Sequence, residues 1–360
     1  MKTKTHFIVI ALLLSYVSFA GNEWNGKHTK EKTIKKEYTV NSDALLKIEN
    51  SYGNINIITY SGNTVSIEVK ITTNGNNLDK VEEKLNEISV DFQSSSNMVS
   101  AKTVFNKNRS SSWWNWGQNT NVNMEINYLI KLPITNSVDL NNDYGSINLD
   151  RLEGHAKINC DYGKITTKEL MADNNSITFD YTNNSFFEYI KSGKISADYS
   201  GFTVAKTKNL EINADYSKSV VEVAENVNYS CDYGSMTVEK ANHIKGDGDY
   251  LTARFGEIYK SIQLTSDYGS IKIDRMTANA GNVYIDSDYT GITIGYDSGY
   301  SFQFDINLEY ASLRGDEDFQ FTKKKTESTD KYYQGYYGTS NTGNLVKITS
   351  DYGSVTFKRN

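Results

Sequence analysis

Eleven acidic residues, each standing directly before a tyrosine, are the first candidates for chemistry in this sequence. They are Asp143, Asp161, Asp180, Asp198, Asp215, Asp232, Asp249, Asp267, Asp288, Glu309 and Asp351. Carboxylates are ligands that Ca²⁺ prefers, so a stacked row of them could bind the ion. A structural role is the alternative, because Asp at a tight corner accepts hydrogen bonds from backbone N–H groups. We favour the structural role, since the calcium-binding nonapeptide Gly-Gly-x-Gly-x-Asp is absent.

The tyrosines that follow these acids form a second candidate surface. They are Tyr144, Tyr162, Tyr181, Tyr199, Tyr216, Tyr233, Tyr250, Tyr268, Tyr289, Tyr310 and Tyr352, with Tyr52 as an upstream copy. Aromatic rings in a row suit the faces of pyranose sugars. The rings share the parity of apolar positions two and four residues earlier, which predicts that they pack inward or at a corner. We therefore expect them to stack on one another and stabilise neighbouring repeats rather than to bind sugar.

Two aromatic clusters lie outside this repeat and are the candidate ligand-binding residues. They consist of Trp113, Trp114 and Trp116 in one Ser/Asn-rich segment, and of Tyr332, Tyr333, Tyr336 and Tyr337 in another polar segment. Large aromatic side chains in polar loops are typical of binding surfaces. The alternative is that both loops fold back and cover the repeats.

The sequence offers little for catalysis. His28, His155 and His243 are scattered, and no nucleophile motif stands near them. A polysaccharide lyase needs clustered acidic metal ligands beside a basic residue, and no such group stands around the arginines, which are Arg109, Arg151, Arg254, Arg275, Arg314 and Arg359. We expect no enzyme activity, no catalytic residue, no metal and no cofactor. A polysaccharide-degrading enzyme on a β-helix remains the alternative, because fold alone does not exclude it.

The repeat that positions these side chains has strand character. From Tyr144 to Tyr310 the tyrosines are 17 to 21 residues apart. The residue four before each tyrosine is apolar in every copy except Gly246, while the residue three before is polar, which predicts a strand with one buried face. Glycine follows the tyrosine in six of twelve copies and suits a tight corner. A second strand follows, as in Ile147 and Leu149.

A fixed period of this size predicts stacked repeats. Repeats stacked at about 4.8 Å pair their strands in parallel and bring equivalent residues into columns. We therefore predict an all-β, single-domain parallel β-solenoid (β-helix) that is about 50 Å long over the continuous repeats. The Leu-x-x-Leu-x-Leu spacing of leucine-rich repeats is absent.

Composition shifts divide the chain into segments. We expect a signal peptide at 1–20, a flexible leader at 21–40, an N-terminal cap with the first coil at 41–138, and solenoid coils at 139–360 interrupted by an insertion loop at 315–344. Within the cap, Leu78, Val81, Leu85 and Ile88 share one face of a short helix that Asn77 is placed to cap. A distinct cap is expected because an open solenoid end exposes unpaired strand edges.

The N-terminal segment and the overall charge indicate the compartment and the partners. Lys2 and Lys4 precede an apolar run over 7–14 and small residues before Gly21, which predicts export to the periplasm, the cell surface or the medium. No later run approaches the roughly 20 apolar residues of a membrane span. Cleavage would leave 36 of the 38 basic residues against 44 acidic ones, which argues against a nucleic-acid partner.

The two cysteines are expected to stay unpaired. Cys160 and Cys231 occupy the same position in their repeats, two residues before a tyrosine, but they are four repeats apart. That separation is about 19 Å at the spacing of stacked strands, which is far beyond the reach of a disulfide. We interpret both as small buried residues.

The motif Gly-x-Ile-x-Ile links the chain to a known family. It occurs as Gly53-Asn54-Ile55-Asn56-Ile57 and as Gly269-Ser270-Ile271-Lys272-Ile273, and a Leu132-Pro133 step precedes Val138-Asp139-Leu140. In these features the chain resembles the exported bacterial putative-adhesin domain family, a family of unknown function. The resemblance implies an exported β-solenoid and transfers no catalytic residue.

The leading hypothesis from the sequence is a non-enzymatic exported β-solenoid. It would act as an adhesin or a cell-envelope binding or structural protein, presenting its aromatic loops to a glycan or a cell-surface protein. A calcium-stiffened structural rod is a further alternative. The oligomeric state is left open.

Overall fold

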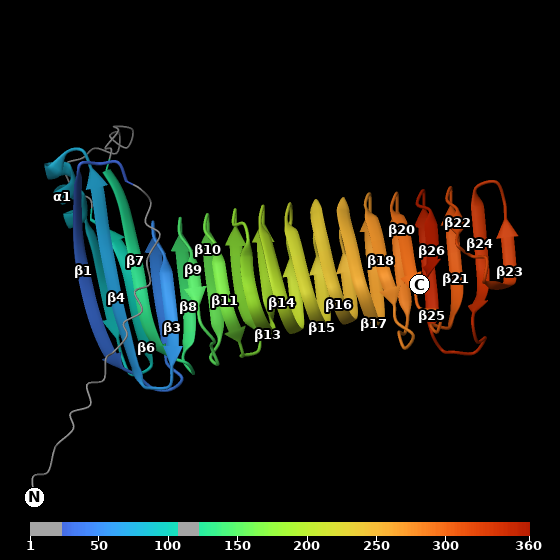
Figure 1. Ribbon diagram of the computed structural model, residues 1–360, viewed down its shortest axis with the longest axis horizontal. Coiled ribbons are helices and arrows are strands. Elements are labelled where there is room, and N and C mark those ends of the chain that lie inside the picture. Colours follow the sequence, from blue (N-terminus) through green and yellow to red (C-terminus); the bar gives the residue numbers. More distant parts are fainter. Residues whose placement is uncertain (1–23, 107–121) are drawn as a thin grey trace, which may run out of the picture.

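The protein is elongated and built almost wholly from β-strands, as the sequence predicts (Figure 1). The computed structural model describes residues 24–106 and 122–360. In this part of the chain, 26 strands and one helix are present, and all the strands belong to one hydrogen-bonded network. Among the described residues, no helix is long and apolar enough to cross a membrane.

The N-terminal region contains strands of both directions. Its elements are β1 (His28–Thr39), β2 (Leu45–Ser51), β3 (Ile55–Tyr60), β4 (Thr64–Gly75), α1 (Leu78–Glu87), β5 (Ile88–Ser94), β6 (Met98–Phe105) and β7 (Val122–Pro133). Antiparallel pairs join β1 to β4, β4 to β7 and β5 to β6. The strands of the Tyr52 repeat, β2 and β3, pair in parallel with β6 and β7 on one side and with β8 and β9 on the other.

Two expectations for this region meet different outcomes. The helix is confirmed, and the side chain of Asn77 accepts a hydrogen bond from the Lys80 backbone N–H at 3.1 Å, while Val81 is buried. Ile88, expected on the same helical face, instead begins β5 and is fully buried there. The flexible leader is wrong over most of its length, because β1 pairs with β4 along twelve residues and Ile34 packs on the core.

The middle of the chain repeats one unit. Its strands are β8 (Ser137–Asp143), β9 (Ile147–Leu149), β10 (Ala156–Asp161), β11 (Ile165–Leu170), β12 (Asn175–Asp180), β13 (Ser185–Asp198), β14 (Gly201–Asn213), β15 (Lys218–Ser230), β16 (Gly234–Asp247), β17 (Leu251–Asp267), β18 (Ser270–Met276), β19 (Val283–Asp288) and β20 (Gly291–Tyr296). Successive repeats pair in parallel, so Asp143 lies opposite Asp161, and Asp161 opposite Asp180.

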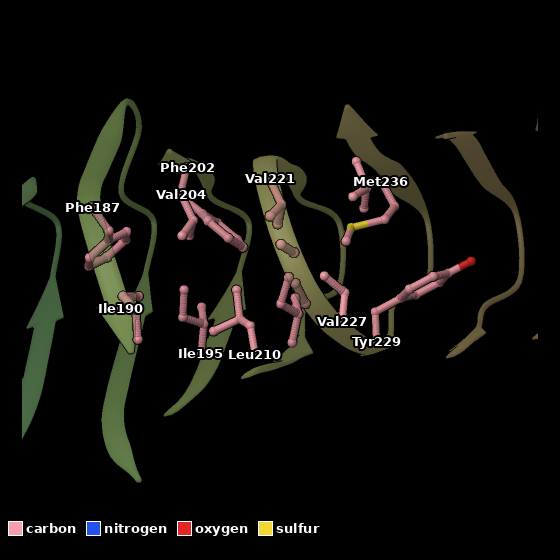
Figure 2. Close-up of a cluster of buried hydrophobic side chains, with 14 of the residues drawn as sticks. Phe187, Ile190, Ile195, Phe202, Val204, Leu210, Val221, Val227, Tyr229 and Met236 are labelled. Carbon is pink, nitrogen blue, oxygen red and sulfur yellow. The ribbon is translucent and has the colours of Figure 1, made fainter. Parts of the chain in front are cut away.

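Each repeat contributes to two rows of strands. The strand before the tyrosine joins a pre-tyrosine row that runs through β8, β10 and β12, and the strand after it joins a post-tyrosine row that runs through β9 and β11. The long strands β13 to β17 supply one half to each row. The first half of β13 therefore pairs with β11, and its second half pairs with β12. Apolar side chains from neighbouring repeats, among them Ile195, Phe202 and Leu210, fill the interior (Figure 2).

The C-terminal strands do not follow the order of the chain. They are β21 (Phe302–Glu309), β22 (Leu313–Arg314), β23 (Gln320–Thr326), β24 (Asp330–Tyr337), β25 (Leu345–Asp351) and β26 (Val355–Arg359). The last repeat inserts between two earlier ones, because β25 pairs with both β19 and β21, and β26 with both β20 and β22 (Figure 1).

The insertion loop expected at 315–344 contains two strands instead. β24 pairs antiparallel with β21, and β23 pairs antiparallel with β24, so a hairpin closes this end of the molecule. Alternate residues of β24 are buried, with Tyr333 6% and Tyr337 7% exposed. The segment forms a strand because its aromatic residues cover the apolar side chains that the outermost repeat leaves open.

The cysteines behave as predicted. Cys160 and Cys231 are both free and buried. Burial raises the pKa of each thiol to about 12, which removes the reactive thiolate at neutral pH. The Cys160 thiol donates a hydrogen bond to the carbonyl oxygen of Gly145 at 3.3 Å.

Candidate functional site

The repeat tyrosines form one continuous row, which we call the tyrosine ladder. In spatial order it consists of Tyr52, Tyr144, Tyr162, Tyr181, Tyr199, Tyr216, Tyr233, Tyr250, Tyr268, Tyr289, Tyr352 and Tyr310. Neighbouring ring centroids are 4.7 to 5.2 Å apart, and the ring planes are within 8° of parallel. The expected ring-on-ring stacking is therefore present. At the outer end, the edge of Phe105 meets Tyr52 at 6.1 Å.

The ladder lies on the surface. Its side chains are 41 to 55% exposed, so the inward orientation expected from strand parity is wrong, whereas the corner position is right. The parity argument fails because all twelve tyrosines have φ between 48° and 64°, in the left-handed region. A left-handed residue interrupts the alternation of a strand, and its side chain no longer follows the buried face.

The tyrosine, and not the glycine after it, takes the left-handed conformation. Among the described glycines, only Gly315, Gly338 and Gly343 have positive φ, and none of them follows a ladder tyrosine. The glycines have another role. A Cβ built on Gly145 would collide with the Gly53 carbonyl oxygen, and one on Gly163 with the Gly145 carbonyl oxygen. Glycine is needed there because one repeat passes very close to the next.

Hydrogen bonds between repeats hold this strained corner. The backbone N–H of every ladder tyrosine except Tyr310 donates to the carbonyl oxygen of the acidic residue in the next repeat, at 2.9 Å from Tyr144 to Asp161 and 3.0 Å from Tyr199 to Asp215. At the end of the row, the Tyr310 N–H donates to the Thr329 carbonyl oxygen at 3.0 Å. A non-glycine residue in the left-handed region costs on the order of 1–3 kcal/mol and persists only where its surroundings determine it. Here the same inter-repeat hydrogen bond recurs at every ladder tyrosine except Tyr310.

The acids beside the ladder, which we call the acidic column, also bond from repeat to repeat. A carboxylate oxygen of Asp180 accepts the backbone N–H of Asp198 at 3.0 Å, and Asp215 accepts that of Asp232 at 3.0 Å. These bonds support the structural interpretation, although the donor lies in the neighbouring repeat and not in the same corner. Partial burial, followed by the neighbouring carboxylates, raises the pKa of Asp249 and of Asp288.

Within the described residues, the acids of the column neither cluster in threes nor pair with a cation. Within residues 24–106 and 122–360, no three His, Cys, Asp or Glu side chains gather into a group that could hold a metal ion. The column also takes part in no ion pair in the described part of the chain, although acids in other columns do. Lys168 bonds Asp150 at 2.7 Å, and Lys191 bonds Asp173 at 2.9 Å, each across one repeat. Carboxylates about 5 Å apart repel by roughly 1 kcal/mol in water and about 3 at an effective dielectric of 20.

The chemistry that the ladder offers follows from its stacking. Each ring face is covered by its neighbours, so the surface presents ring edges and hydroxyl groups. Within the described residues no ladder hydroxyl bonds to protein, whereas the hydroxyls of Tyr259 and Tyr300 bond to Glu257 and to the Gly281 carbonyl. Partial desolvation, followed by neighbouring tyrosines and acids, raises the pKa of Tyr162, Tyr233 and Tyr268.

The aromatic residues predicted from the sequence to bind a ligand differ in their burial. Trp113, Trp114 and Trp116 lie outside the described residues. In β24, strand alternation separates Tyr333 and Tyr337, which are buried, from Tyr332 and Tyr336, which are partly exposed. The Tyr332 hydroxyl donates to Asp305 at 3.1 Å, and the Lys323 ammonium lies 4.9 Å from its ring centroid. The buried pair covers the end of the core, as the alternative interpretation holds.

A charged patch that the sequence analysis missed lies on the post-tyrosine row. Arg254 bridges Glu239 at 2.8 Å and Asp274 at 2.5 Å, and Arg275 bridges Asp297 at 2.9 Å. These residues line a shallow open pocket. The sequence does contain a signal for this patch, because its opposite charges are about one repeat apart. Residues at that spacing are distant in the sequence and do not form a local cluster. Every one of these carboxylates is paired with a guanidinium, so the patch supplies no free base or metal ligand.

No protein-family model matches the chain, and no curated protein matches its sequence. Similar solved structures include a putative adhesin from Parabacteroides merdae ATCC 43184, with 12% identity and a TM-score of 0.32 over 91% of this chain and 96% of that one. Another is a putative lipid binding protein from Parabacteroides distasonis ATCC 8503, with 9% identity and a TM-score of 0.31 over 92% and 98%. A third is a putative cell adhesion protein from Clostridium sporogenes ATCC 15579, with 11% identity and a TM-score of 0.19 over 92% and 100%. At scores this low, the function must be argued from the surface of the chain itself.

Proposed function

We propose that this chain is a non-enzymatic, exported β-solenoid that works as an adhesin-like binding rod of the cell envelope, with the tyrosine ladder as its contact surface. The observation that carries the proposal is the unbroken row of half-exposed tyrosines with left-handed backbone conformation. Backbone strain of this kind gathers at functional sites. A purely structural corner would be satisfied by Asn or Gly, which tolerate this conformation better.

The strand pairing supports the rod. Parallel, in-register pairing from repeat to repeat gives each unit contacts only with its neighbours, which is the organisation of a solenoid. Such a rod holds its side chains at fixed intervals, so a partner meets many identical groups at once. Weak contacts that repeat along a rigid surface add up to a strong attachment. Export rests on the signal-like residues 1–20, which lie outside the described residues.

A protein partner suits the ladder better than a glycan. Sugar rings stack on the faces of aromatic rings, and the ladder covers those faces with its own neighbours. Tyrosine edges and hydroxyl groups are abundant at protein interfaces. Tyr332 and Tyr336, and the tryptophans Trp113, Trp114 and Trp116, remain proposed contributors to a second contact with a glycan or a cell-surface protein.

The binding role can be tested by removing ladder rings. We suggest replacing Tyr199, Tyr216 and Tyr233 by Asn, which accepts the left-handed backbone. The matched control replaces three tyrosines outside the ladder by Asn, the exposed Tyr259 and Tyr284 and the partly exposed Tyr189. Retention of each purified chain on isolated cell envelopes is measured by pull-down, with circular dichroism as a check of folding. We expect at least a tenfold loss for the ladder variant alone, and equal retention of both variants would refute the role.

A further inference from the structure

We propose that the tyrosine ladder docks onto a polypeptide surface of stacked β-strands that carries a column of Lys or Arg side chains. This inference rests on the proposed binding role and names the partner for it. The docking surface is the tyrosine ladder. The negative charge of the acidic column beside it, and the spacing between successive tyrosines (the rungs of the ladder), determine which partner it binds.

Charge indicates a cationic partner. The acidic column runs beside the ladder and takes part in no ion pair within the described residues, while neighbouring columns pair their acids with lysines, as Asp139 with Lys157 at 3.4 Å and Glu211 with Lys194 at 2.8 Å. A docked cation would therefore replace water at these carboxylates without breaking an existing bridge. A second copy of this chain is disfavoured, because each ladder would bring its own acidic column to the contact and the whole chain carries a net charge of −6.

Spacing indicates stacked strands. The rungs of the ladder are 4.7 to 5.2 Å apart, and stacked β-strands repeat at about 4.7–4.9 Å. A partner with this repeat meets every rung in the same way over the whole ladder. Other extended polypeptides lose register. Residues on one face of a single strand lie about 6.8 Å apart, and the turns of an α-helix about 5.4 Å apart, so the helix drifts by roughly one rung over the ladder.

Geometry lets the two groups of each rung act together. The acid and the tyrosine are adjacent in the chain, and the acid is half-buried or exposed in every repeat. A Lys or Arg stem would lie along the ring edges while its charged head reaches the carboxylate. A carboxylate oxygen such as that of Asp215 already accepts a backbone N–H, and a carboxylate has lone pairs left for a second donor.

The test uses fibres of known repeat. The full chain is mixed with fibrils of a short amphipathic peptide that shows Lys on its outer face, with fibrils of the same peptide showing Glu, and with soluble poly-L-lysine of equal charge. Binding is measured by co-sedimentation for the fibrils and by fluorescence anisotropy for the polymer. We expect the Kd per lysine to be at least tenfold lower for the Lys fibrils than for poly-L-lysine, and no binding to the Glu fibrils.

Two variants assign the contact to its residues. Asp198→Asn, Asp215→Asn and Asp232→Asn together keep the oxygen that accepts each inter-repeat hydrogen bond and remove only the charge, so folding should survive. We expect this variant and the ladder variant to weaken binding to Lys fibrils at least fivefold, and the off-ladder tyrosine control to leave it unchanged.

The outcomes separate this inference from the proposed function. Equal Kd values for Lys fibrils and poly-L-lysine would overturn the match of spacing, and binding to Glu fibrils would overturn the match of charge. If retention on envelopes needs the ladder while Lys fibrils do not bind, the partner named here is wrong and the binding role stands. If retention does not need the ladder, the proposed role fails.

Discussion

The two aromatic regions of this protein, the all-tyrosine ladder and the mixed Phe and Tyr cluster at the C-terminal end, arrange their rings differently. Along the ladder, the rings are exposed and nearly parallel, with 1° between the planes of Tyr162 and Tyr181. At the C-terminal end, Phe302 is buried and meets Tyr296 and Phe319 edge to face, at 86° and 84°. Isolated aromatic pairs favour offset or edge-to-face contacts. The buried cluster mixes edge-to-face and near-parallel pairs, with 17° between the planes of Phe302 and Phe357. In the ladder every pair is near-parallel, because the backbone places each ring about one strand spacing from the last.

The difference shows which region holds the fold together. The buried cluster removes apolar area from water and closes an open end of the core, while the ladder keeps about half of each ring in water. Stability should therefore depend strongly on the cluster and weakly on any single rung. The following predictions test this contrast, and they run from the largest expected effect to the smallest.

Removing Phe302 should be the most damaging single change. Its ring contacts Tyr296, Tyr300, Phe319, Tyr337 and Phe357. Phe302→Ala should lower the free energy of unfolding by about 3–5 kcal/mol, because it leaves a cavity in a packed site. Urea denaturation followed by circular dichroism measures this loss. A change below about 1 kcal/mol would show that the cluster does not stabilise the end of the core.

Changing a ladder glycine should have an intermediate effect. A Cβ on Gly163 would strike the backbone carbonyl of Gly145, so Gly163→Ala should cost about 1–3 kcal/mol of unfolding free energy. The control is Gly291→Ala, because a Cβ there meets nothing within 4 Å. Thermal melting of both variants makes the comparison. Equal melting temperatures would contradict the close approach of repeats at this corner.

Removing one ladder ring should change stability little. Tyr216→Asn loses two stacking contacts, at 4.8 and 4.9 Å, but relieves a φ of 52° that tyrosine tolerates poorly. The two effects oppose each other, so we expect a net change within about 1 kcal/mol. Urea denaturation under the conditions used for Phe302→Ala provides the direct contrast. A loss as large as that of Phe302→Ala would make the ladder a principal source of stability.

Alkaline titration should distinguish the two regions by the order in which their tyrosines ionise. Burial raises the pKa of Tyr296 to about 12, and partial desolvation with neighbouring charges raises the pKa of Tyr268 and Tyr352. The folded pKa values exceed the unfolded value of about 10, so these groups stabilise the fold below that pH and lose the contribution as pH rises through the folded values. Ultraviolet absorbance at increasing pH, compared between the native chain and the variants Tyr268→Phe and Tyr352→Phe, should show these two ladder tyrosines ionising before unfolding releases Tyr296. Ionisation of Tyr268 and Tyr352 at the ordinary pKa would contradict their partial desolvation.

Several features were predictable because they depend on local pattern. Apolar residues such as Ile158, four before the tyrosine, are buried as expected, and Asn77 caps α1. The exposure of the ladder was not predictable from parity, because a left-handed residue leaves no mark in a period-two pattern. The candidate site was thus visible in the sequence as a repeat, but its orientation was not.

Strand pairing at the two ends of the molecule was also not predictable from the sequence. All repeats share the same strand pattern, so the local sequence does not indicate which repeats pair. It therefore could not predict that the Tyr352 repeat lies between those of Tyr289 and Tyr310. β1 was missed because its lysines resemble a solvated leader, although Ile34 packs on the core and Tyr38 beside it. In edge strands, such lysines also discourage pairing with a further chain.

The placement of the Tyr352 repeat makes residues 345–360 an internal layer of the molecule, although they follow the closing hairpin in the chain. Loss of residues 345–360 would not trim a tail. It would remove this layer, separate β19 and β20 from β21 and β22, and leave the closing hairpin paired with β21 alone. The strands on both sides of the missing layer would then expose unpaired edges.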